Sequence, residues 1–224
     1  WVPSQEHNLS ISGGTEKLQY VLSGSFLDQK GLLRHGTDKF QRYTLNSKIT
    51  ANITDWLKVT LNSKWTREDF QRPTYLTSSF FHNLARKWPV HPAYDPNGFP
   101  MDEGEIEQME NGGEQNSQKD YYTNQLHVVI EPIKNWRINL EGSVRTTTQY
   151  QHWEVLPVHA YDVNGDPYYT VWDMGYGSYS AGSSRVDEYS WKENYYTTNI
   201  YSDYFKQFDN GHYFKVMAGF NAQP

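Results

Sequence analysis

The chain has 224 residues and a formal net charge of −6, which argues against a nucleic-acid partner, because nucleic acids select a basic face. Its mean hydropathy of −0.83 and the lack of an apolar run near about 18 residues exclude a transmembrane helix. An aromatic content of 16% predicts an ordered fold, and the absence of Cys excludes disulfides and zinc–thiolate sites.

Apolar and polar residues alternate along eight predicted strands, which pair as four antiparallel hairpins. Each hairpin closes through a turn of a few residues, such as the glycine-containing turn after Gly13. The predicted pairs are His7–Gly13 with Leu18–Leu27, Phe40–Ile53 with 57–65, Tyr121–Ile130 with Trp136–Tyr150, and Tyr189–Phe205 with His212–Ala222.

Two long connections separate these hairpins, at about residues 67–120 and 151–188. Within the first, the apolar spacing of Tyr75–Trp88 predicts a short helix that ends before Pro89. Short turns at one end of a sheet and long loops at the other are typical of a transmembrane β-barrel.

Eight charged residues of the predicted strands lie on the polar face: Arg42, Lys48, Lys58, Lys64, Arg137, Glu141, Arg145 and Lys215. A charge that faces hydrocarbon costs roughly 2–4 kcal/mol at mid-membrane. A soluble antiparallel sheet with one wet face gives the same alternation. Strands of about ten or more residues favour the membrane interpretation, because soluble strands average five to six. The expected fold is therefore all-β, an antiparallel transmembrane β-barrel segment of about eight strands with long extracellular loops.

The ends of the chain suggest a segment of a larger protein. No signal peptide precedes Trp1, although an outer-membrane protein must be exported. Strands at both ends would leave two unpaired edges, which natural sheets avoid.

The two long connections share a motif. Residues 93–100 (AYDPNGFP) resemble residues 160–167 (AYDVNGDP), and a His precedes each. The simpler interpretation is a small hairpin whose Asn-Gly supplies the positive-φ residues of a tight turn. The alternative is a calcium site, because Asp162, Asn164 and Asp166 match the first oxygen positions of an EF-hand loop, with Asp173 at the twelfth. Pro167 stands where that loop requires Gly.

Loop aromatics are the candidate contacts for a ligand or partner, since their flat apolar faces carry a polar tip. Packing of the loops against each other explains them equally simply. These residues are Trp88, Tyr94, Trp153, Tyr161, Tyr168, Tyr169, Trp172, Tyr176 and Tyr179.

Catalytic chemistry is not indicated by any motif. The carboxylates of Glu103, Glu105, Glu107 and Glu110 are expected to form a solvated acidic loop. The eight His show no HExxH pattern, and GxSxG, P-loop and GxGxxG motifs are absent. We therefore expect no catalytic residue, no firm metal site, no cofactor and no enzymatic activity.

Several segments together resemble the SusC/RagA family of TonB-dependent outer-membrane transporters. The run from Gln5 to Lys17 (QEHNLSISGGTEK) is followed by Tyr20–Gly31 with its Asp-Gln-Lys-Gly, and then by Lys39–Tyr43. Residues 89–98 (PVHPAYDPNG) are similar to an extracellular loop of that family, and 211–220 (GHYFKVMAGF) to another of its barrel strands. The resemblance covers most of the chain and is strongest over residues 5–65.

The resemblance implies a 22-stranded barrel in the outer membrane of a gram-negative bacterium. Such a barrel is plugged from its N-terminal side and imports oligosaccharides, or in some members peptides, with energy from TonB and a SusD-like surface lipoprotein as lid. The chain departs from this pattern because the plug and most of the strands are absent from it. Its expected partners are the remaining strands, outer-membrane lipid, the lipoprotein, TonB through the missing plug, and the substrate.

Two interpretations without a membrane remain open. A soluble carbohydrate-binding β-sandwich would also suit the loop aromatics and the acidic charge. A β-rich glycosidase would need two facing carboxylates roughly 5–10 Å apart, and the strands carry few Asp and Glu.

Overall fold

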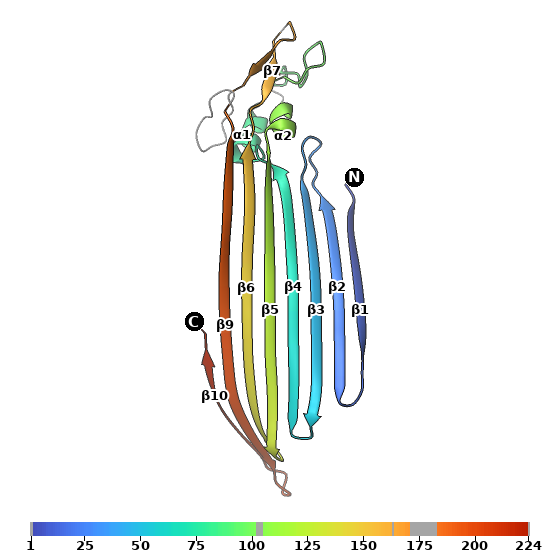
Figure 1. Cartoon of the computed structure of the whole chain (residues 1–224), viewed down its shortest axis with the longest axis vertical. Coiled ribbons are helices and arrows are strands. Elements are labelled where there is room, and N and C mark those ends of the chain that lie inside the picture. Colours follow the sequence, from blue (N-terminus) through green and yellow to red (C-terminus); the bar gives the residue numbers. More distant parts are fainter. Residues whose placement is uncertain (1, 102–104, 163, 171–182, 224) are drawn as a thin grey trace.

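The chain folds around one antiparallel sheet of eight strands, as a computed structural model shows (Figure 1). The structure describes residues 2–101, 105–162, 164–170 and 183–223. Neighbours in the sheet follow the chain, in the order β1-β2-β3-β4-β5-β6-β9-β10. The strands are β1 (Ser4–Gly14), β2 (Leu18–Lys30), β3 (Lys39–Thr54), β4 (Leu57–Pro73), β5 (Glu114–Ile133), β6 (Trp136–Val155), β9 (Arg185–Gln207) and β10 (Tyr213–Ala222).

The four predicted hairpins are confirmed, each with the predicted partner. Their short turns lie together at one end of the sheet, and the long connections lie at the other (Figure 1). Asn135 in the turn between β5 and β6 has a φ of 72°, and Gly211 before β10 has a φ of 85°. Asn and Gly accept these left-handed conformations better than other residues, which explains their place in the turns.

Most strands of the sheet are longer than their alternation predicts. β4 continues to Pro73 and β5 begins at Glu114, so the first long connection is 74–113 rather than 67–120. Likewise β6 ends at Val155 and β9 begins at Arg185, so the second is 156–184 rather than 151–188. The extensions of β4 and β5 are mostly polar on both faces, and a strand that is polar on both sides loses its alternating pattern. The extension of β6 instead ends in Trp153 and Val155, which pack into a small core.

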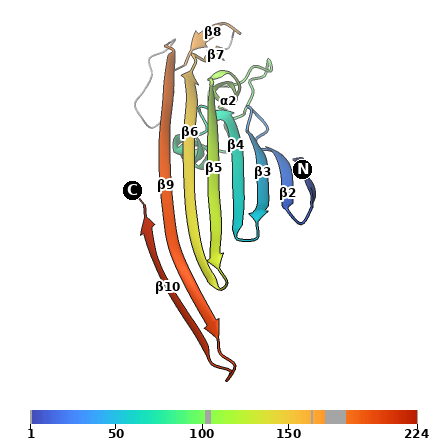
Figure 2. The same cartoon turned by 60° about the horizontal axis from the view of Figure 1, so that its bottom comes forward.

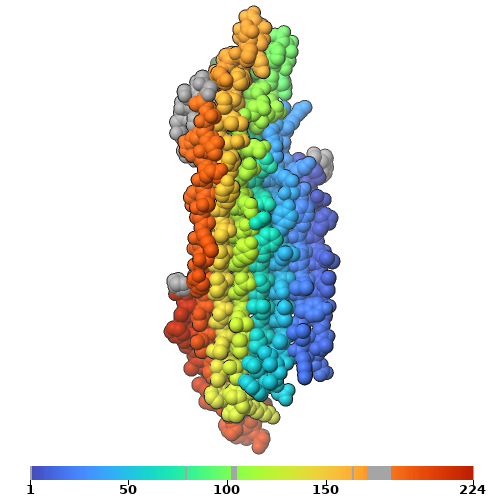
Figure 3. Space-filling model, in the orientation of Figure 1, coloured from blue at the N-terminus to red at the C-terminus, as the bar shows by residue number. Residues whose placement is uncertain are grey.

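The sheet is curved, and the strands at its two edges bend away from a common plane (Figure 2). Side by side, the strands form one continuous slab (Figure 3). In the part of the chain that the structure describes, no second layer covers the apolar face, so Leu9, Leu45 and Ile53 are each more than half exposed. The β-sandwich interpretation needs such a layer. None of the described helices is long and apolar enough to cross a membrane.

A small core lies at the loop end of the sheet. Buried Tyr75, Met109, Val155 and Val158 form it, and Trp153 packs against them. Helix α1 (Ser78–Arg86) confirms the helix predicted within Tyr75–Trp88, whereas α2 (Ile106–Asn111) was not predicted. The core ties both long connections to the ends of the strands.

The expectation of a solvated acidic loop is wrong for Glu105. Its side chain is buried and lies 3.3 Å from the Lys87 ammonium, so this carboxylate joins α2 to the segment after α1. Glu107 instead accepts a hydrogen bond from Asn111, and Glu103 falls outside the described residues. A buried carboxylate requires such a partner.

Candidate functional site

One face of the sheet carries an apolar band that crosses all eight strands. Cross-strand register places Leu22, Leu61 and Leu126 on this face, together with Ile138 and Phe220. On β4 the band runs from Leu57 to Trp65, which is about 26 Å at roughly 3.3 Å per residue. An outward apolar band of about this height surrounds a barrel in a membrane.

Polar groups within the band are small and bond to each other. Ser63 Oγ donates a hydrogen bond to Asn124 Oδ1 at 2.7 Å across the β4–β5 pair. Lower in the band, Trp136 Nε1 donates to Ser202 Oγ at 2.8 Å. A polar group that leaves water without a partner costs free energy, and these bonds avoid that cost.

Aromatic rings end the band on the side of the long loops. Phe26 packs against Tyr43 with ring centroids 5.1 Å apart, and Trp65 lies 6.4 Å from Tyr122. Rings of this kind mark the interfaces of membrane barrels.

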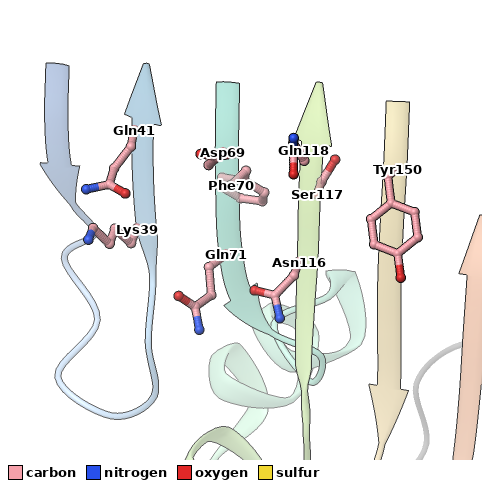
Figure 4. Close-up of a pocket in the computed structure, with 9 residues that line it drawn as sticks. All are labelled: Lys39, Gln41, Asp69, Phe70, Gln71, Asn116, Ser117, Gln118 and Tyr150. Atoms are coloured by element: carbon pink, nitrogen blue, oxygen red, sulfur yellow. The ribbon is translucent and has the colours of Figure 1, made fainter. Parts of the chain in front are cut away.

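Immediately beyond these rings the same side of the sheet becomes polar. Arg67 donates two hydrogen bonds of 2.9 Å to Asp120, which also accepts from Trp65 Nε1 at 3.0 Å. A hollow of about 360 Å³ follows, and its lining is mostly amide and charged, with Lys39, Gln41, Asp69, Gln71, Asn116 and Gln118 beside Phe70, Ser117 and Tyr150 (Figure 4). This change of character defines the upper limit of the apolar band.

The opposite face contains a larger hollow of about 620 Å³ that we call the basic hollow. Strands β3, β4, β5 and β6 form it, together with Ser25 of β2. Its lining residues are Ser25, Arg42, Thr44, Lys64, Thr66, Glu68, Tyr121, Thr123 and Arg145. Sequence alternation places Arg42, Lys64 and Arg145 on the polar face, but only register brings them together.

Register fixes the spacing of the charges. Thr123 on β5 lies opposite Lys64 on β4 and Arg145 on β6, so the two cations flank it. At about 4.8 Å per strand, their backbones are roughly 10 Å apart. Four residues further along β4, Glu68 is flanked in the same way by Arg42 and Lys119.

Carboxylates do not neutralise the basic hollow. Within the described residues, no ion pair joins Arg42, Lys64 or Arg145 to an acidic side chain. The one lining carboxylate, Glu68, accepts a hydrogen bond from Tyr121 Oη at 3.4 Å.

Other arginines of the sheet show the contrast. Arg137, also on the polar face, lies 2.8 Å from Asp203. Arg67, on the opposite side, is held by Asp120.

Aromatic rings hold a further cation at the rim. The Lys119 ammonium lies 5.1 Å from the centre of the Tyr121 ring and 5.7 Å from that of Trp191. Both distances suit cation–π attraction, which stabilises the ammonium without removing its charge. The positive charge of this region therefore stays available to a ligand.

Among the described residues, the loop aromatics expected to contact a ligand or partner differ in environment. Trp88 and Tyr94 are exposed, whereas Trp153 belongs to β6 and packs into the small core. Tyr161 stacks on Phe99 with ring centroids 4.5 Å apart. Trp172, Tyr176 and Tyr179 fall outside the described residues.

The repeated motif forms two matching hairpins. Asp95 Oδ1 accepts the backbone N–H groups of Asn97 and Phe99, and Asp162 Oδ1 accepts those of Asn164 and Asp166, all at 2.8–2.9 Å. Gly98 and Gly165 have φ values of 90° and 84°, as the hairpin interpretation predicts. The second motif connects two short strands, β7 (His159–Tyr161) and β8 (Pro167–Tyr169).

These N–H groups, first that of Asp166 and then that of Asn164, lower the pKa of the Asp162 carboxyl. The Asp162 carboxylate thus closes the turn by accepting hydrogen bonds from these backbone N–H groups. Among the described residues no group of three or more His, Asp and Glu side chains is arranged to hold a metal. Asp173 falls outside those residues, and the calcium hypothesis stays a prediction.

Together, the long antiparallel strands, the apolar band and the polar opposite face define a segment of a β-barrel wall. Among solved structures, the chain is similar to a chain of the RagAB peptide importer in its "closed-closed" state, with a TM-score of 0.73 and 17% identity over 98% of this chain. The "open-open" state gives a TM-score of 0.74 and 18% identity over 97% of this chain.

This chain spans 24% of the length of each of those chains, and at such low identity the likeness establishes the fold. No protein-family model and no curated protein matches the sequence.

Proposed function

We propose that this chain forms part of the barrel wall of a SusC/RagA-like, TonB-dependent transporter in the outer membrane of a gram-negative bacterium. The two-faced sheet is the observation that carries the proposal. Its apolar band, which Trp65 and Tyr122 limit at the loop end, would contact lipid. Its polar face, with Lys64 and Arg145, would line a water-filled interior.

In this arrangement the short turns lie in the periplasm and the long connections outside the cell. The connections carry exposed Trp88, Val90 and Tyr94, which suit contact with a SusD-like surface lipoprotein. Energy would enter through a plug domain and TonB. The wall itself performs no chemistry and acts by contact with its cargo.

The proposed cargo is an oligosaccharide that the lipoprotein captures. A peptide cargo is the second candidate, because the solved structures with this fold include a peptide importer. Both are oligomers rich in hydrogen-bonding groups, which the Thr, Gln and Asn side chains of the polar face can bind.

Deletion of the gene in its host tests the proposal. Uptake of labelled oligomers should fall to the level of a TonB-deficient strain, and complementation by the complete protein should restore it. The surface lipoprotein should copurify with the complete protein in detergent. Uptake that persists without the gene, or that ignores the loss of TonB, would refute the role in transport.

A further inference from the structure

The basic hollow is an unusual feature for a chain with a net charge of −6. Its lining contains three cations and one carboxylate, and Lys119 stands at its rim. By contrast, Arg137 on the same face is paired, with its guanidinium 2.8 Å from Asp203. Cations that converge on a hollow without partners are suited to bind an anion.

The shape of the basic hollow favours a carboxylate over a compact ion. The backbones of Lys64 and Arg145 are roughly 10 Å apart on either side of Thr123, and Arg42 lies beside Glu68 on β3. Extended chains can place successive carboxylates at such separations. The hydroxyl groups of Thr44, Thr66 and Tyr121 add neutral hydrogen-bonding partners for the rest of the ligand.

The basic hollow lies toward the loop end of the sheet, and this position favours a cargo that arrives from the side of the long connections. Lys64 is the neighbour of Trp65, which belongs to the aromatic limit of the apolar band. Arg42 and Glu68 lie beyond that limit, toward the long connections. A ligand would therefore meet these cations as it enters the interior.

We propose that the basic hollow binds carboxylate groups of the cargo and so selects acidic oligomers for import. This inference rests on the proposed function and extends it to a substrate class. The carboxylates could belong to uronic acids of an oligosaccharide or to acidic side chains of a peptide. The chemistry of recognition is the same for both.

Matched ligands that differ only in charge test the inference with the purified complete transporter. The probes are an oligogalacturonate with its methyl ester, and a Glu-containing oligopeptide with its Gln counterpart. We expect at least one acidic probe to bind about tenfold more tightly than its neutral form, with the difference shrinking as salt rises. The probe pair that shows the effect identifies the source of the carboxylates.

Variants then assign the effect to the basic hollow. Lys64→Gln and Arg145→Gln should each weaken the acidic probe about fivefold to tenfold and leave its neutral form unchanged. Lys58→Gln is the matched control, since Lys58 lies on the same face of β4 but outside the lining. Heat-modifiable migration on a gel verifies that each barrel is folded.

Three results would overturn the inference: equal binding of acidic and neutral probes, an equal loss in the Lys58 control, or a loss in both variants for acidic and neutral probes alike. The last would assign the cations to contacts within the protein. TonB-dependent uptake of the neutral forms is measured in parallel, so the transport function can stand while the selection of acidic cargo fails.

Discussion

A charge placed on the apolar band separates a lipid-facing wall from a wet sheet. Leu61 lies midway between Leu57 and Trp65, about 13 Å along β4 from each end of the band. Arginine at the middle of a bilayer costs about 2–4 kcal/mol in a barrel. Leu61→Arg should therefore lower the folding equilibrium constant by roughly 30-fold to nearly a thousandfold, at about 1.4 kcal/mol per factor of ten.

The neighbouring Asn62 provides the control, because successive residues of a strand point to opposite faces. Asn62→Arg should change the free energy of unfolding by less than about 1 kcal/mol, since its side chain stays in water. The assay is equilibrium urea unfolding of the complete protein in lipid vesicles, followed by heat-modifiable migration. Equal effects of the two variants, or no effect of Leu61→Arg, would refute the assignment of the faces.

Three further predictions concern the loop end of the sheet. Asp120→Ala removes the acceptor of Arg67 and Trp65, and should lower the free energy of unfolding by about 1–3 kcal/mol in urea titrations; an unchanged midpoint would contradict this. Lys87→Met leaves the buried Glu105 carboxylate unpaired, and should speed protease cleavage within 74–113, with Lys134→Met in an exposed turn as the neutral control. The pKa of Asp162 is lowered in the folded hairpin, so the stabilisation that its carboxylate gives the hairpin is complete above the unfolded pKa of about 4. This stabilisation is lost as the pH falls through the lower pKa of the folded state. Proteolysis of that hairpin should rise in acid, and Asp162→Ala should abolish this pH dependence.

The faces of the sheet could be predicted from sequence because each strand encodes them independently. Alternation from Leu57 to Trp65 is enough to orient β4, whatever its neighbours. The sequence did not show where the strands end on the side of the long connections. There, residues such as Arg67 and Asp120 are polar on the same face that carries the apolar band further along the strands. Only their cross-strand hydrogen bonds reveal that the sheet continues.

The basic hollow was missed for a different reason. Arg42, Lys64 and Arg145 were recognised as polar-face residues, but they belong to three strands separated by up to about a hundred residues. Register alone determines that they converge, and alternation does not fix register between distant strands. The helix α2 has six residues, too few to show a periodic pattern. By contrast, Asn-Gly in each repeated motif was a sufficient signal for its hairpin.

The environment of single side chains along β4 tests the central claim most directly. The chain has no Cys, so each single Cys substitution from Leu57 to Trp65 gives a unique site for a spin label within it, once any Cys elsewhere in the complete protein is replaced by Ser. In membranes, labels at Val59, Leu61 and Ser63 should collide mainly with lipid-soluble oxygen. Labels at Lys58, Thr60 and Asn62 should collide mainly with a water-soluble nickel chelate. A profile without this two-residue period would contradict the account of one face in lipid and one in water.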